Sequence, residues 1–175
     1  MRLLFELDTK DYNPNSARLI RPSVRAIIIQ SGRIAMIHSL KYNYYKFPGG
    51  GIENGENHLL TLLREVREEA GLMVIPDSVK AYGYVHRQQL GRQGKIFVQD
   101  NYYYFCQVDQ KTASQELDPY ESEEQFTLTW VLPEQAIAIN QSPQHGQRSY
   151  DPHFFIMTAR ETKVLQLLQR EAYFA

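Results

Sequence analysis

The stretch from Gly50 to Leu72 constrains the fold of this 175-residue chain more than any other part of the sequence. A glycine loop opens it, and Gly71 near its end suits the left-handed position just after a helix. Between them, apolar residues recur at i, i+4, i+7 and i+11, which places them on one face of a helix. These residues are Leu59, Leu63, Val66 and Ala70. The stretch predicts an amphipathic helix packed on a core.

A second face of this helix is acidic. Glu65, Glu68 and Glu69 are related by i+3 and i+4, so their carboxylates project together. Like charges at this spacing weaken a helix by roughly 0.2–0.5 kcal/mol per pair, and a shared cation would offset that cost. Clustered carboxylates suit hard divalent ions such as Mg2+ or Mn2+. A solvated surface paired with Arg64 and Arg67 is the alternative, and the glutamates alone favour it.

The spacing of the whole stretch resembles the Nudix box of the MutT-like Nudix hydrolases. Every fixed position of that motif is filled, which is far more specific than a lone glycine-rich loop. The matching residues are Gly50, Glu56, Arg64, Glu65, Val66, Glu68, Glu69, Gly71 and Leu72. An apolar run ending in Phe47-Pro48-Gly49-Gly50 leads into the box, as is common in the family. The resemblance outweighs the surface alternative for the acidic face.

The resemblance implies an α+β fold, specifically a Nudix-type α/β/α sandwich with a mixed central sheet. A chain of this length forms one domain, so residues 1–175 are expected to be a single Nudix domain. Residues 1–21 would be an N-terminal extension or edge strand, and residues 50–72 the box.

Other strands and helices follow from local patterns. The β-branched run Val24–Gln30 predicts a strand covered on both faces, with residues 34–38 as its hairpin partner. Strands are also expected at residues 81–89 and 97–108, and Asp151-Pro152 predicts the start of a final helix reaching Arg170. The acidic residues 116–124 are expected to form a loop.

Roles at the site follow from the family resemblance, residue by residue. Glu68 and Glu69 match the principal metal ligands, and Glu65 matches a further ligand or the general base. The Gly50 carbonyl matches the loop ligand, and Arg64 matches the arginine that holds the catalytic glutamate. Glu56 is expected to stabilise the loop and helix rather than bind metal.

A further metal-binding carboxylate often comes from a distant loop in the family. Glu124 is the preferred candidate and Glu123 the second, because both precede the strand expected at residues 126–132. An acidic surface turn is the alternative for either residue.

Residues outside the box are candidates for substrate binding. Arg25, Tyr45, Phe47, Gly49 and Gly50 are the candidates, because they lie in or before the glycine loop or interrupt the strand run. An aromatic ring there would stack on a base, which contributes roughly 1–3 kcal/mol. Packing within the sheet is the commoner use of such rings, and a strand-end arginine reaching solvent is the alternative for Arg25.

Composition excludes several classes of function. A net charge of −1 gives no electrostatic case for binding a nucleic-acid polymer or a membrane. Cys106 is the only cysteine, so an internal disulfide and a cysteine zinc site are excluded. No run approaches the ~20 apolar residues of a membrane span, and the N-terminus does not resemble a signal peptide. We expect a cytoplasmic protein; a homodimer is an open alternative.

The expected reaction is Mg2+-dependent hydrolysis of a nucleoside diphosphate linked to another group, with Mn2+ as an alternative ion. Nucleoside triphosphates, including oxidised ones such as 8-oxo-dGTP, lead the candidate substrates, with nucleotide sugars and dinucleotides as alternatives. A Nudix fold used only for ligand binding is the competing function. A divalent-ion buffer is weaker still, because it leaves the glycine loop without a purpose.

Overall fold

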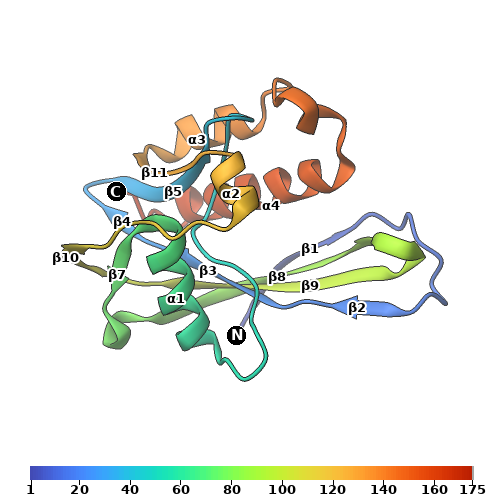
Figure 1. Cartoon of the computed structure of the whole chain (residues 1–175), viewed down its shortest axis with the longest axis horizontal. Coiled ribbons are helices and arrows are strands. Elements are labelled where there is room, and N and C mark those ends of the chain that lie inside the picture. The colour runs from blue at the N-terminus through green and yellow to red at the C-terminus, as the bar shows by residue number, and fades with distance from the viewer. Residues whose placement is uncertain (175) are drawn as a thin grey trace.

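The computed structural model describes residues 1–174, and Figure 1 shows helices on two sides of the β-sheets. Helix α1 (His58–Ala70) lies on one side of the central strands, while α3 (Pro133–Asn140) and α4 (Pro152–Arg170) lie on the other. A short helix, α2 (Pro119–Glu123), precedes the last strand. This arrangement is the expected α+β Nudix fold.

The largest sheet has five strands and mixed direction. Its order is β1-β8-β9-β2, with β3 also paired to β9; β8 and β9 are antiparallel, and β1, β2 and β3 run parallel to their neighbours. The strands are β1 (Leu3–Asp8), β2 (Arg18–Ile20), β3 (Ser23–Ile27), β8 (Lys80–Leu90) and β9 (Ile96–Phe105). The β8–β9 hairpin extends beyond the helices as a long ribbon edged by β1 and β2 (Figure 1).

Two smaller antiparallel sheets complete the fold. One has the order β11-β5-β4, with β6 also paired to β5, and the other joins β10 to β7. Their strands are β4 (Ile29–Gln30), β5 (Arg33–Ser39), β6 (Tyr44–Lys46), β7 (Leu72–Val74), β10 (Val108–Thr112) and β11 (Phe126–Val131). Short 3-10 turns span Pro76–Ser78, Arg92–Gly94 and Gly146–Tyr150.

The central strands are buried on both faces, as their β-branched sequence predicts. Ala26 and Ala35 pack in the same cluster as Val66 of α1. Their chain neighbours Ile27 and Ile34 pack in a second cluster with side chains of α4. Since successive side chains of a strand point to opposite faces, each helix layer covers one face.

The pairing of the first long strand differs from the prediction. Only β4 forms a hairpin with β5, whereas β3 pairs along its length with β9. The expected N-terminal edge strand is present as β1, parallel to β8. The acidic residues 116–124 include α2, because Pro119 at the first turn and a capping box between Asp118 and Glu121 start a helix there.

Helix α1 is bounded as the sequence predicts, and three of the four residues expected on its apolar stripe pack in the core: Val66 and Ala70 are buried, and Leu63 packs against their cluster. The Asn57 side chain accepts the N–H of Leu60 at 2.9 Å, and Gly71 ends the helix at φ +64°. Leu62 is fully buried, whereas Leu59, which we expected in the core, is 38% exposed. The buried residues Leu62, Val66 and Ala70 are spaced by four, and Leu59 lies in the first turn.

No helix among residues 1–174 combines the length and the apolar character that crossing a membrane requires.

Candidate metal and diphosphate site

The glycine loop presses tightly on β3. Gly49 has φ +133°, and a Cβ there would lie 2.2 Å from the carbonyl oxygen of Val24, so a side chain cannot be accommodated. The Arg25 guanidinium donates a hydrogen bond to the Gly49 carbonyl. The Gly50 carbonyl accepts the N–H of Val24 at 3.0 Å, which leaves its second lone pair for another ligand.

Arg64 joins three of the box glutamates. Its Nε and Nη2 donate to the two oxygens of Glu56 at 2.7 and 2.9 Å. Its Nη1 donates to Glu65 at 2.9 Å and to Glu68 at 3.1 Å. The bidentate bond to Arg64 holds the pKa of Glu56 near 2. The arginine therefore neutralises part of the acidic face and orients Glu65 and Glu68 relative to the loop.

The Glu65 carboxyl group lies directly beneath the glycine loop. A Cβ added to Gly50 would come within 2.3 Å of that carboxyl group, so the absence of a side chain at Gly50 makes the space. Burial raises the pKa of Glu65 despite the opposing effect of Arg64. A carboxylate with a raised pKa is a better proton acceptor near neutral pH.

Glu69 anchors the helix to the loop. Only 2% of the residue is exposed, and its Oε2 accepts the N–H of Gly49 at 2.9 Å. Its Oε1 accepts a hydrogen bond from the ammonium group of Lys46, a buried residue of β6. Lys46 was not among the sequence candidates. The only hint in the sequence is that Lys46 is a single cation within the aromatic run before the loop.

The carboxylate from the distant segment that approaches Glu69 is Glu121. It is buried in α2 and lies 4.0 Å from the Lys46 ammonium. Burial, followed by the nearby charge of Glu69, raises the pKa of Glu121. Sequence reasoning missed it, although the capping box at Asp118 could have marked Glu121 as an inward-facing first-turn residue.

The two carboxylates preferred from the sequence have other partners. Glu124 is buried and accepts hydrogen bonds from Arg148 at 2.6 Å and from the Tyr44 hydroxyl at 2.7 Å. Glu123 is paired with Lys41 at 2.6 Å on the surface. Neither makes a contact with the box glutamates among the described residues, so a metal role for Glu124 remains a prediction.

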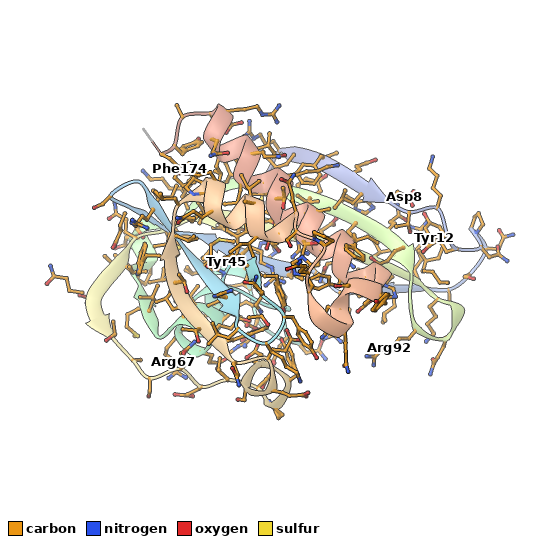
Figure 2. All side chains as sticks on the ribbon, turned by 90° about the horizontal axis from the view of Figure 1, so that it is seen from above. Asp8, Tyr12, Tyr45, Arg67, Arg92 and Phe174 are labelled. Atoms are coloured by element: carbon orange, nitrogen blue, oxygen red, sulfur yellow. The ribbon has the colours of Figure 1, made fainter. Side chains whose placement is uncertain are left out.

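The two candidate aromatic rings are used in the core. Tyr45 is 6% exposed, stacks on His38 with ring centres 4.3 Å apart, and lies in the interior of the molecule (Figure 2). Phe47 is fully buried against Tyr103. Both rings therefore pack within the protein, which was the commoner use considered from the sequence, because β6 lies beneath α3 and α4. Arg25 and Gly49, by contrast, lie together at the loop.

The oxygen atoms at the loop are of the kind that bind a hard divalent cation. Three box carboxylates and the Gly50 carbonyl lie around one loop, and oxygen ligands of this kind suit Mg2+. In the described residues, however, no three acidic or histidine side chains converge closely enough to enclose an ion. Their oxygens are turned toward Arg64 and Lys46 instead. Binding a metal therefore requires side-chain rotation away from these cations.

The fold and the loop–helix site together define a Nudix-type domain. The family model described as the NUDIX domain matches residues 19–153. This match covers most of the chain, so the protein belongs to the NUDIX family, and the resemblance read from the box is confirmed. Membership indicates a hydrolase that acts on pyrophosphate bonds of small-molecule nucleoside diphosphate derivatives. No curated protein matches the chain.

Solved structures are similar in fold. A NUDIX hydrolase from Nitrosomonas europaea is 20% identical over 77% of this chain and 89% of its own, with a TM-score of 0.55. A structure from a study of MutT of Aliivibrio salmonicida and Vibrio cholerae is 18% identical over 81% and 99%, with a TM-score of 0.47. A putative family member from Chromobacterium violaceum is 19% identical over 93% and 86%, with a TM-score of 0.48. The first supports the fold; the other two superpose too loosely to add to it.

Proposed function

We propose that this protein is a Mg2+-dependent pyrophosphohydrolase that cleaves a nucleoside diphosphate linked to another moiety. The observation that carries the proposal is the placement of Glu65 and Glu68, held by Arg64, beside a glycine loop to which Glu69 is bonded. Oxidised or ordinary nucleoside triphosphates are the first substrates to test, followed by nucleotide sugars and dinucleotides.

The protein's own groups would divide the work. Glu65, Glu68, Glu69 and the Gly50 carbonyl would hold the ion, which when bound would neutralise phosphate charge and acidify water. Glu65 is also the candidate to accept a proton from the attacking water, because its carboxyl group lies against the glycine loop. Arg25, which is bonded to the Gly49 carbonyl, would orient the diphosphate at the loop.

A binding module without catalysis is the competing function. Loss of catalytic positions would favour it, and in this chain every box position is filled. A cytoplasmic location and a homodimer are retained as predictions that separate experiments must address.

The test is a nucleotide screen with detection of phosphate and pyrophosphate, in the presence and absence of Mg2+. In Glu69→Gln we expect turnover of the preferred substrate to fall at least about 10²-fold, the scale of removing one group that stabilises transition-state charge. Glu116→Gln is the matched control, because Glu116 pairs with Arg67 at the surface and does not contact the loop.

Two results would overturn the proposal. One is unchanged Mg2+-dependent hydrolysis in Glu69→Gln. The other is nucleotide binding by the wild-type protein with no metal-dependent product, which would favour the binding module. Thermal unfolding of each variant must accompany the assay, since Glu69 is buried and its substitution removes the carboxylate that is bonded to the Lys46 ammonium group.

A further inference from the structure

A basic cleft lies on the face of β8 and β9 next to the first turn of α4. Its volume is about 600 Å3, and four arginines line it against one aspartate. The arginines are Arg21, Arg87, Arg92 and Arg148, and the aspartate is Asp151. We call this set of residues the arginine cleft. Figure 2 shows Arg92 at the tip of the β8–β9 hairpin, on the side of the molecule where α4 begins.

Three of the four arginines have no acidic partner among the described residues. Arg148 is compensated, because it bonds to Glu124 at 2.6 Å and to Asp151 at 3.1 Å. Arg21 and Arg92 are exposed, and within residues 1–174 neither forms an ion pair or a side-chain hydrogen bond. The cleft therefore carries positive charge that the fold itself does not neutralise.

Arg87 is the most unusual of these residues. It is only 7% exposed, and it donates to the Gln89 side chain at 2.6 Å and to the His153 carbonyl at 3.2 Å. Both acceptors are neutral. Burial, reinforced by the nearby charge of Arg160, lowers its pKa to about 9, so it remains a cation at neutral pH. Glu161 and Asp151 oppose this shift through their charge, but neither forms an ion pair with Arg87. A buried cation without a directly bonded carboxylate is costly, and a bound anion would offset that cost.

One residue of the cleft, Arg21, lies beside the glycine loop. A Cβ built on Gly51 would lie 3.9 Å from the Arg21 guanidinium, and Gly51 bridges to Ser23 of β3. On β9, Asn101 pairs with Ser23 while Gln99 pairs with Arg87. Alternate residues of a strand share a face, so Arg87 and Ser23 lie on the same face of the sheet, where Ser23 and Asn101 are buried. Arg21 therefore connects the cleft to the loop, because it lines the cleft and lies beside Gly51.

We propose that the arginine cleft binds a phosphate group of the substrate that lies outside the scissile diphosphate. This inference rests on the proposed function and narrows it: the preferred substrate carries an additional phosphate, either as a monoester on a sugar or as an extension of the phosphate chain. The planar guanidinium fork suits phosphate oxygens through paired, charge-assisted hydrogen bonds. A neutral moiety would leave Arg87 buried without an anion.

The experiment compares matched substrates that differ by one phosphate. ADP-ribose and its 2′-phosphate test a sugar monoester, and a nucleoside 5′-triphosphate and 5′-tetraphosphate test a longer chain. The variants are Arg21→Gln and Arg92→Gln, both at exposed positions. Arg18→Gln is the matched control, because Arg18 precedes Leu19 on β2 and so points to the opposite face, near Gln88.

We expect the phosphorylated member of at least one pair to have a kcat/KM at least about tenfold higher (~1.4 kcal/mol). Arg21→Gln and Arg92→Gln should each remove most of that preference while changing kcat/KM for the other member by less than about twofold. Arg18→Gln should retain the preference. The pair that shows the effect identifies the source of the phosphate.

Equal rates within both pairs, or equal losses for both members in the variants, would overturn the inference and leave the proposed function standing. If the wild-type protein hydrolyses none of these compounds, calorimetric measurement of their binding tests the cleft independently of the proposed activity. Tighter binding of the phosphorylated member, lost in Arg21→Gln and Arg92→Gln, would support the cleft; equal binding would overturn it.

Discussion

The box and the arginine cleft carry opposite charges, and they differ in how far those charges are paired within the protein. Around the box, Arg64 and Lys46 neutralise the carboxylates at hydrogen-bond distance. In the cleft, Arg21, Arg87 and Arg92 have no acidic partner among the described residues. The charges of the acidic region are thus largely neutralised by the protein itself, whereas the charges of the basic region are not.

This difference indicates how each region would meet its ligand. A cation at the box must compete with Arg64 and Lys46 for the same oxygens, so metal binding involves exchange of partners. An anion in the cleft meets three guanidinium groups, those of Arg21, Arg87 and Arg92, that form no ion pair among the described residues, whereas Arg148 is already paired with Glu124 and Asp151. The first region is therefore expected to depend on the geometry that Arg64 imposes, and the second on charge alone.

Of the variants that test this difference between the two regions, Arg64→Gln should lose the most activity. It removes the group that holds Glu56, Glu65 and Glu68 together, and loss of such an orienting partner typically lowers metal affinity or activity 10–100-fold. We expect a fall of about that size in kcat/KM, with a loss of about 1–2 kcal/mol in the free energy of unfolding.

Arg67→Gln is its control, because Arg67 bonds bidentately to the surface residue Glu116 and approaches the box only at 3.9 Å from Glu68, without a hydrogen bond. The variant should retain activity within about twofold and stability within about 0.5 kcal/mol. Steady-state kinetics and urea unfolding measure both quantities. If Arg64→Gln and Arg67→Gln behave alike, Arg64 is not the organising residue of the box.

Gly50→Ala should give an intermediate effect, with Gly51→Ala as its matched control. A Cβ at Gly50 would meet the Glu65 carboxyl at 2.3 Å and displace it, whereas at Gly51 the nearest atom is 3.9 Å away. Because Glu65 is a flexible side chain, we expect about a tenfold loss of kcat/KM in Gly50→Ala, within the range found when the positioning of a catalytic group is disturbed, and little change in unfolding temperature.

Gly51→Ala should remain close to wild type in both activity and unfolding temperature. Equal activity in the two alanine variants would show that the space beneath Gly50 is not used by Glu65. A steep loss of stability in Gly50→Ala would instead point to a structural requirement at this position.

The smallest effect concerns acid titration. In the folded protein the pKa of Glu56 is about 2, below its ordinary value of 4.5, because Arg64 bonds to its carboxylate. A depressed folded pKa means that this pairing contributes stability above about pH 4.5 and loses it as pH falls toward 2. NMR titration of the Glu56 carboxyl should show a low pKa that rises toward 4.5 in Arg64→Gln. A titration unaffected by Arg64→Gln would contradict the pairing.

Local patterns predicted the parts of the fold that depend on nearby residues. Asn57 and Gly71 bound α1 as expected, and the β-branched run at Val24 is buried on both faces. Long-range pairing was not accessible: nothing near β3 shows that its partner is β9 rather than the adjacent strand. The exposed position of Leu59 likewise depends on where the sheet ends beneath the helix.

The site was predictable where the motif is local. Arg64 and the three glutamates of α1 lie around the loop as their spacing indicates. Contributions from elsewhere were harder to predict. Lys46 was not among the candidates. Glu124 and Glu123 were chosen instead of Glu121, because the choice depends on how α2 orients its carboxylates. The arginine cleft joins the residue after β2, the β8–β9 hairpin and the segment before α4, which lie far apart in sequence.

The most direct test of the account is Mn2+ binding followed by electron paramagnetic resonance in the absence of substrate. The wild-type protein and Glu116→Gln should bind the ion with equal affinity, while Glu68→Gln should bind at least about tenfold more weakly, because Glu68 is an accessible carboxylate of the box. Equal Mn2+ affinity in all three proteins would contradict the claim that the box carboxylates form the metal site.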